Sequence, residues 1–232
     1  MLPFWKGFFV IVLFFSAVSP SVWGGEAAIP VDDEASFSSS IYGNWEPETV
    51  VAPRARVPKT GVTTSYIGRD DGYLRRGVGW PVPRFTDNGN GIVRDNLTGL
   101  IWLKDAGCEK FYASDTTGHN NRDFRHAMSA ANNLADGYCG LTDGSVAKDW
   151  RLPNVREMHS LVDYGVSGPA LSNAAGTGRW TEGDAFLNMM SGHQYWSSTS
   201  VDIFLAWIID LGNGMITLET KAHGDISVWP VR

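Results

Sequence analysis

Asp149-Trp150-Arg151-Leu152-Pro153-Asn154-Val155-Arg156-Glu157-Met158 is the stretch of the chain that decides most about its fold. It predicts the start of a helix, because Asn154 is a favoured N-cap residue and Glu157 follows at the spacing of a capping box. Gly165 marks the expected end of this helix. Its apolar residues recur at helical spacing and share one face: Val155, Met158, Leu161 and Val162.

A second helix is predicted earlier in the chain. Asp123 is placed to cap its start, and Gly137 is expected to end it. Its apolar residues also recur at helical spacing: Phe124, Ala127, Met128, Ala131 and Leu134. Each helix therefore has one apolar face that we expect to pack against the core.

Short strands are predicted on both sides of the two helices. Asn88-Gly89 lies between two β-like runs, residues 84–86 and 92–95, and an Asn-Gly pair in this setting favours a hairpin. Residues 166–194 are rich in Gly and Ser and are expected to be mostly loop. The other predicted strands are residues 100–103, 195–199, 206–210, 215–218 and 226–232. Strands, then helices, then a late group of strands predict an α+β fold and not alternating βαβ units.

The composition excludes some classes of protein. Of the 232 residues, 43% are hydrophobic, which is enough for a core and excludes wholesale disorder. The formal net charge is −6, which argues against a general nucleic-acid-binding protein, because such proteins need a basic surface.

The N-terminus predicts export. Lys6 precedes an apolar run at residues 7–18, Pro20 follows the run, and Gly24 completes an acceptable cleavage site. The run is shorter than the roughly 20 apolar residues that a membrane-spanning helix needs. We therefore interpret residues 1–24 as a cleaved signal peptide. The mature chain is expected to have no transmembrane segment and to be periplasmic or extracellular.

Residues 25–57 are predicted to form a disordered tether. They are polar, interrupted by prolines and without sustained periodicity, so they bury too little apolar surface to fold. The globular domain is expected to extend over residues 58–232.

Cys108 and Cys139 are the two cysteines of the chain, and both follow the predicted signal peptide. An isolated pair in an oxidising compartment usually forms a disulfide. The sequence has neither a C-x-x-C motif nor a His/Cys cluster with zinc spacing, so a redox or metal role is not favoured. We predict a structural disulfide that staples the domain.

Five phrases of the sequence, in this order, resemble the C-terminal domain of the Legionella collagen-like adhesins. They are RFTDNG (84–89), DNLTGLIW (95–102), DWRLPN (149–154), YWSS (195–198) and VWPVR (228–232). The resemblance runs from about residue 58 to residue 232. At greater distance the chain is similar to C-type-lectin-like proteins and formylglycine-generating enzymes, because residues 150–153 open a helix that carries Glu157. This likeness implies a compact fold with two helices packed on a twisted antiparallel sheet.

The resemblance implies where the protein acts, which is outside the cell, more than it implies a particular reaction or ligand. The adhesin that gives the family its name uses this domain outside the cell, as a trimer, to bind sulfated glycosaminoglycans. The present sequence has no collagen-like Gly-X-Y tract and is acidic, whereas a site for polyanions needs clustered basic residues. Its basic clusters, Arg54/Arg56/Lys59 and Arg75-Arg76, lie early in the chain. Sulfated-glycan binding is therefore not assigned to any residue.

The expected function is that of a secreted, non-catalytic binding or adhesion module of a bacterial envelope, which recognises a surface glycan or a protein. Two alternatives stay open: a divergent envelope enzyme with the fold of the formylglycine-generating enzymes, and a purely structural partner domain. An enzyme would use His159 and Asp163, which stand four positions apart. The common hydrolase, zinc-protease and P-loop motifs are absent. No cysteine follows Cys139, whereas formylglycine-generating enzymes depend on cysteines in their late loops.

Asp87, Asn90 and Asp95 are weak candidates for a calcium site. They offer oxygen ligands, but Gly89 and Gly91 interrupt the pattern of an EF-hand loop. The Asn-Gly hairpin explains the same residues. No cofactor is therefore expected, and calcium is kept as the weaker alternative.

Trp180, Arg179, Tyr195 and Trp196 are the candidate ligand-binding residues. Arg179 and Trp180 belong to a Gly-rich loop, where an exposed aromatic side chain suits stacking on a sugar or anchoring a partner. Alternation along a strand places Tyr195 and Trp196 on opposite faces, so at most one of them is expected in the core if one face is solvated.

Overall fold

The computed structural model describes residues 57–111, 123–189 and 194–232. The described residues all belong to one compact unit, which comprises residues 51–232. The predicted signal peptide, and the predicted tether except for its last residue, lie outside the described residues.

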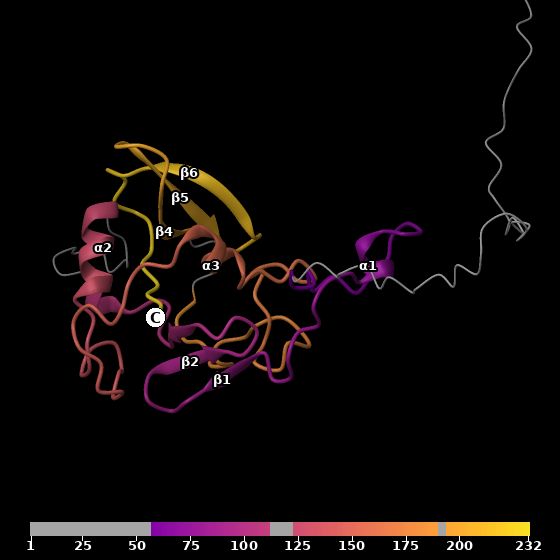
Figure 1. The fold of residues 1–232 in the computed structure, drawn as a ribbon, viewed down its shortest axis with the longest axis horizontal. Coiled ribbons are helices and arrows are strands. Elements are labelled where there is room, and N and C mark those ends of the chain that lie inside the picture. The colour runs from indigo at the N-terminus through magenta and orange to yellow at the C-terminus, as the bar shows by residue number, and fades with distance from the viewer. Residues whose placement is uncertain (1–56, 112–122, 190–193) are drawn as a thin grey trace, which may run out of the picture. The chain divides into compact units, whose positions relative to one another are not determined.

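The described strands form two three-stranded antiparallel sheets (Figure 1). The first sheet has the order β1-β2-β3 and consists of β1 (Phe85–Asp87), β2 (Ile92–Asp95) and β3 (Ile101–Leu103). The second has the order β4-β5-β6 and consists of β4 (Gln194–Ser200), β5 (Leu205–Asp210) and β6 (Met215–Thr220). The sequence predicted a strand in each of these places, and the expected hairpin joins β1 to β2.

The hairpin between β1 and β2 depends on Gly91. This residue has a φ of 83°, and a Cβ atom there would lie 2.4 Å from the carbonyl oxygen of Gly140. The turn itself is closed by the backbone N–H of Asn88, which donates to the carbonyl of Ile92 at 3.1 Å. Only glycine allows this approach, which fastens the hairpin to the segment that follows Cys139.

The helices of the described residues are short. They are α1 (Asp71–Leu74), the 3-10 helix η1 (Glu109–Phe111), α2 (Phe124–Asn132) and α3 (Val155–His159). Both predicted helix starts are confirmed: Asp123 caps α2, and Asn154 with Glu157 forms the complete capping box of α3. Within the described ranges, no helix is long and apolar enough to cross a membrane.

Both predicted helices end earlier than expected. After α2, the N–H of Gly137 donates to the carbonyl of Leu141 at 2.9 Å, so the chain turns into a loop. After α3, the N–H groups of Leu161 and Val162 donate to carbonyls three residues back, which is the tighter bonding of a 3-10 turn. Local and tertiary hydrogen bonds thus end both helices before the apolar pattern of the sequence does.

Trp229 connects the two sheets. Its ring centroid lies 5.3 Å from that of Trp102 in β3, 5.4 Å from that of Tyr195 in β4 and 4.9 Å from that of Phe186. Its indole N–H donates to the carbonyl of Leu103 at 2.7 Å. All four rings are buried, and aromatic pairs at such distances stabilise a core beyond their area of contact.

The C-terminal segment, residues 226–232, does not form the predicted strand. Ser227 makes a single bridge with Tyr195 of β4, and Val231 makes single bridges with Trp102 of β3 and with Arg151. Its backbone also hydrogen-bonds to both sheets: the N–H of Arg232 donates to Ile101 at 2.9 Å, and the N–H of Ser227 donates to Gln194 at 2.8 Å. The segment therefore lies against the edge strands β3 and β4 and fastens the two sheets together. The mixed helix and antiparallel-sheet architecture is therefore confirmed, and the expectation of one sheet is corrected to two.

A fully buried ion pair joins Arg84 to Asp95 at the base of the first hairpin. Arg84 Nε lies 2.9 Å from Asp95 Oδ1, and Nη2 lies 3.1 Å from Oδ2. Arg84 Nη2 also donates to the carbonyl of Ser160, which follows α3, at 2.7 Å. Asp95 accepts two further hydrogen bonds, from the N–H of Leu97 and the hydroxyl of Thr98, both at 2.8 Å. The pair therefore links the hairpin to the end of α3.

The variant Arg84→Met leaves Asp95 charged, buried and without its main partner. We expect it to lower the free energy of unfolding by about 3–5 kcal/mol. The control is Lys104→Met, which removes the partly exposed ion pair with Asp87 and is expected to cost less than about 1 kcal/mol. Urea unfolding followed by tryptophan fluorescence measures both, and equal losses in the two variants would contradict the special role of the buried pair.

Cys108 and Cys139 form a disulfide with an S–S distance of 2.09 Å, as predicted. The bond closes a sequence separation of 31 residues. Replacing both cysteines by serine is expected to lower the free energy of unfolding by about 3.5–4 kcal/mol, because the unfolded chain gains the entropy of the open loop. Reduced wild-type protein should unfold at the same urea concentration as the double variant. A reduced protein as stable as the oxidised one would show that the bond does not stabilise the fold.

Candidate functional site

Trp180 is buried, with 7% of its surface exposed, so the expectation of an exposed Trp180 is wrong. Its N–H donates to the carbonyl of Leu171 at 2.8 Å, and Ser172 forms an antiparallel bridge with Arg179. The loop is thus folded back on itself with Trp180 turned into the core. Arg179 is exposed, and its guanidinium donates to the carbonyl of Ser167 at 3.4 Å. Of the two residues, only Arg179 is accessible to a ligand.

Tyr195 and Trp196 are both buried, so the expectation that one of them faces solvent is also wrong. The physical reason is that both faces of β4 are covered. The ring of Tyr195 packs on Trp229, and the ring of Trp196 packs edge-to-face on Phe124 of α2, with centroids 5.4 Å apart in each pair. Neither ring offers a face to a ligand.

His159 and Asp163 have separate partners. Because α3 ends at His159, the two residues do not lie on successive turns of one helix. His159 Nε2 is hydrogen-bonded to the hydroxyl of Tyr164, whereas Asp163 accepts from the N–H of Gly165 at 2.8 Å. Burial lowers the pKa of His159 and raises the pKa of Asp163. Both shifts therefore come chiefly from desolvation and not from a mutual interaction.

The three calcium candidates do not converge. Asp95 is paired with Phe85, far from the turn that holds Asn90, and both of its oxygens accept hydrogen bonds from protein groups. Asp87 forms an ion pair with Lys104 at 2.6 Å. Among the described residues, no group of three or more His, Cys, Asp or Glu side chains is placed to hold a metal ion.

A groove of about 960 Å³ lies between the start of α2, the β4–β5 loop and the end of β6. This volume is in the range of clefts that bind small ligands. The lining residues are Asp123, Phe124, Arg125, His126, Met128, Ile203, Phe204, Thr220, Lys221 and Ala222. The start of α2 is far in the sequence from the other two segments, so only the folded chain forms this site.

Large apolar side chains form the walls of the groove. On the β4–β5 loop, Ile203 is 80% exposed and Phe204 is 69% exposed, and the neighbouring Val201 is exposed as well. On the opposite wall, Phe124 and Met128 of α2 are half-buried. Exposed apolar groups gathered beside a cleft are typical of a binding surface.

Hydrogen bonds hold the β4–β5 loop in place. The side chain of Asp202 accepts from the N–H groups of Phe204 and Leu205, both at 2.7 Å. Lys221 donates through Nζ to the carbonyl of Asp202 at 2.6 Å, and its backbone N–H donates to Phe204 at 2.7 Å. Lys221 also accepts from the N–H of Phe124 at 3.0 Å and places its ammonium group 4.8 Å from that ring. The groove is therefore formed before any ligand arrives.

The rim of the groove carries hydrogen-bond donors. Arg125 is exposed, and His126 lies next to it with Nδ1 2.9 Å from Asp123 Oδ1. Lys221 adds a second cationic side chain from the end of β6. Apolar walls with a few donors at the rim can hold a ligand by stacking, apolar contact and hydrogen bonding.

Sequence reasoning did not identify Ile203 and Phe204. The available signal was their position, because two large apolar residues stand in a short turn between two predicted strands, where polar residues are usual. The partner wall on α2 gave no such signal, since Phe124 and Met128 also fit the apolar stripe of a helix.

The sequence matches a known family of protein domains. The profile of the Lcl C-terminal domain family matches residues 91–232, which is more than half of the chain. The matched region includes both helices α2 and α3, the disulfide and the whole of the groove. No curated protein matches the chain significantly. The chain therefore belongs to the Lcl C-terminal domain family.

Proposed function

We propose that the chain is an exported, non-catalytic adhesion module that binds a surface ligand in the groove between α2 and the β4–β5 loop. The observation that carries this proposal is the exposure of Ile203 and Phe204 on a loop that hydrogen bonds hold in place. Membership of an adhesin-related domain family supports a binding role.

A surface glycan is the ligand that the groove favours. The exposed ring of Phe204 suits stacking on a sugar, and Arg125 and Lys221 can donate hydrogen bonds to hydroxyl or carboxylate groups. A surface protein is the second candidate, because the aliphatic Ile203 beside Phe204 suits the apolar centre of a protein interface.

The non-catalytic part of the proposal rests on His159 and Asp163. In the enzymatic alternative these two residues would act together, but each is hydrogen-bonded to a different partner, Tyr164 and Gly165 respectively. Replacing both by alanine is expected to leave ligand binding unchanged.

The proposal also includes export of the protein and a distant relation to C-type-lectin-like proteins. A disulfide suits an oxidising compartment such as the periplasm or the extracellular space. The phrase at residues 150–153 opens α3, which carries Glu157, in the way that the lectin-like resemblance implies. An experimental structure superposed on lectin-like domains tests this relation.

The variant Phe204→Ala tests the groove. It removes an exposed ring that we expect to stack on the ligand, so affinity should fall at least about tenfold, as for other aromatic anchors. The compact unit, residues 51–232, is screened on a glycan array with calcium and with chelator, and hits are titrated by calorimetry.

Tyr138→Ala is the matched control, because Tyr138 is also an exposed aromatic residue but lies outside the groove. Binding that weakens equally in both variants, or only in the control, would refute the groove as the site. No glycan binding together with Phe204-dependent capture of an envelope protein would replace the glycan by a protein ligand.

A further inference from the structure

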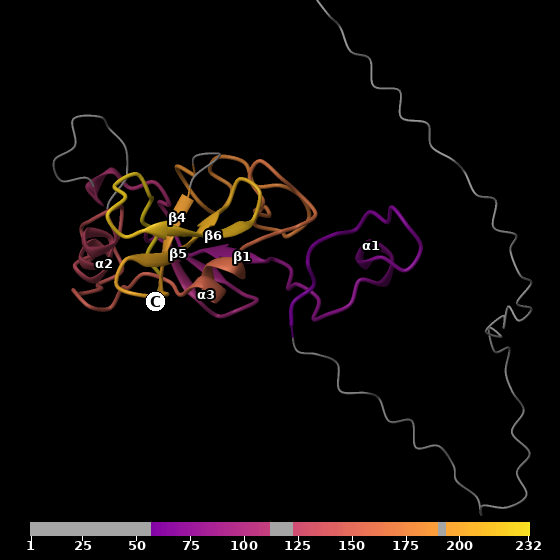
Figure 2. The same ribbon diagram turned by 90° about the horizontal axis from the view of Figure 1, so that it is seen from above.

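Residues 57–78 form a closed loop that precedes the matched family region (Figure 2). Its two ends are bonded to each other: the N–H of Lys59 donates to the carbonyl of Val78 at 3.0 Å, and the N–H of Val78 donates to the carbonyl of Val57 at 2.8 Å. Compact loops with paired ends are frequently functional. The loop contributes no residue to the proposed groove, so ligand binding in the groove does not account for its structure.

The loop is organised around the carboxylate of Asp70. This side chain accepts from the N–H groups of Tyr66 at 2.7 Å, Ile67 at 3.1 Å and Tyr73 at 2.9 Å. These backbone hydrogen bonds, the one from Tyr66 first among them, lower the pKa of Asp70 to about 2. The neighbouring Asp71 accepts from the hydroxyl of Thr60. Both carboxylates of the loop therefore accept hydrogen bonds from other groups of the same loop.

Close backbone packing makes the loop rigid. A Cβ atom on Gly72 would lie 2.0 Å from the carbonyl oxygen of Thr64, so only glycine fits there. Arg75 crosses the loop and donates through Nη2 to the carbonyl of Thr63 at 2.9 Å. The loop therefore presents a preorganised surface and is not a flexible linker.

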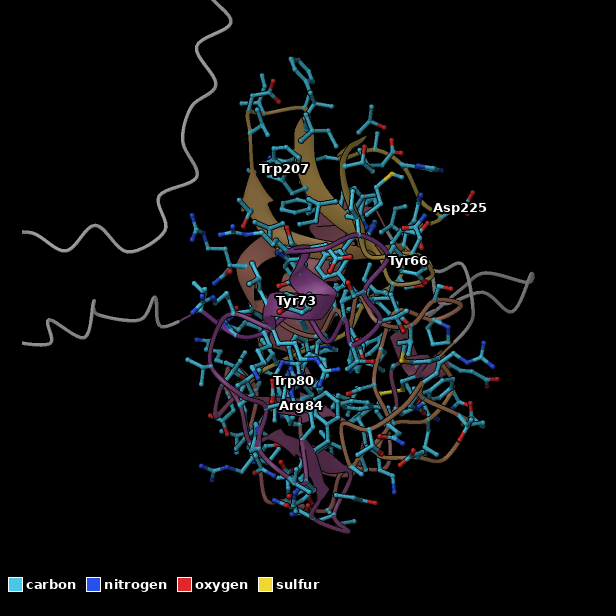
Figure 3. The ribbon with its side chains drawn as sticks, turned by 90° about the vertical axis from the view of Figure 1, so that its right-hand side faces the viewer. Tyr66, Tyr73, Trp80, Arg84, Trp207 and Asp225 are labelled. Carbon is cyan, nitrogen blue, oxygen red and sulfur yellow. A yellow bond between two sulfur atoms is a disulfide. The ribbon has the colours of Figure 1, made fainter. Side chains whose placement is uncertain are left out.

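The outer surface of the loop is apolar and basic. Tyr66 is 89% exposed and Ile67 is 73% exposed, and Tyr73 is exposed as well (Figure 3). Arg69 and Arg76 are also exposed, and among the described residues neither has an ion-pair or hydrogen-bond partner. Four basic and two acidic residues give residues 57–78 a net charge of +2, in a chain whose net charge is −6.

We propose that the 57–78 loop docks the protein on an anionic lipid surface. Tyrosine side chains are favoured at the boundary between lipid and water, and Ile67 can enter the apolar layer beside them. Arginines at that depth are attracted to anionic headgroups and extend toward them. The internal engagement of Asp70 and Asp71 leaves the unpaired charges on the outer side positive.

A fluorophore on the loop tests this proposal directly. The only two cysteines of the chain are bonded to each other, so Ile67→Cys can be labelled selectively with an environment-sensitive dye. We expect a blue shift when residues 51–232 are mixed with phosphatidylglycerol vesicles, and none with phosphatidylcholine vesicles. The matched control is Ile203→Cys in the groove, which is similarly exposed and should show no shift.

Charge variants test the second half of the proposal. The double variant Arg69→Gln/Arg76→Gln should weaken partitioning into anionic vesicles about 25-fold, which is about fivefold for each arginine. Added salt should weaken partitioning of the wild type as well. Tyr66→Ser/Ile67→Ser should reduce binding without changing the salt dependence. All these residues are exposed, so thermal unfolding should be unchanged.

Three results would overturn the inference: no shift at position 67, equal shifts at positions 67 and 203, or binding that the arginine variant leaves intact. Capture of an acidic protein through the loop without vesicle binding would replace the lipid by a protein partner. Phe204→Ala should leave vesicle binding unchanged, so failure of the loop proposal and failure of the groove proposal are distinguishable.

Discussion

A buried charge pair at the base of the first hairpin dictates how the neighbouring segments meet. A guanidinium and a carboxylate removed from water must compensate each other, and removing one of them leaves an uncompensated charge. Arg84 finds Asp95 in β2, the carbonyl of Ser160 after α3, and the ring of Trp80 at 4.7 Å. Trp80 in turn donates its indole N–H to the carbonyl of Lys59 at 2.9 Å. The hairpin and the end of α3 thus meet at the Arg84 guanidinium, and Trp80 connects it to the loop that precedes the family region. Trp80 and Arg84 are labelled in Figure 3.

The parts of the fold that could be predicted depend on interactions between near neighbours. The capping box of Asn154 and Glu157 and the Asn-Gly hairpin are each complete within a few residues, so their patterns suffice. The disulfide was predictable because two cysteines allow one pairing. The ends of α2 and α3 were not predictable, because tighter turns replace the helical hydrogen bonds while the apolar pattern continues. The path of residues 226–232 was not predictable, because hydrogen bonds to other segments decide it.

The candidate site could not be assembled from the sequence for the same reason. Trp180 lies in a Gly-rich stretch that resembles an open loop. The bridge between Ser172 and Arg179 folds this stretch back on itself, and Trp180 is buried in the core. Strand alternation could not show that both faces of β4 are covered, so Tyr195 and Trp196 were misplaced. The groove joins segments that are separated by about eighty residues, and its walls look like ordinary helix and turn residues until they are brought together.

The long-range contacts of residues 226–232 constrain the order in which the core can form. Trp229 and Val231 complete contacts with Trp102 that span more than half of the chain, and the two sheets are joined through them. The sheets cannot be joined through Trp229 until residues 226–232 have reached both of them, so the core closes only after these distant parts of the chain meet. Long-range contacts of this kind also slow folding. The architecture therefore makes docking of residues 226–232 a late step in folding, and it is the step that completes the core between the two sheets.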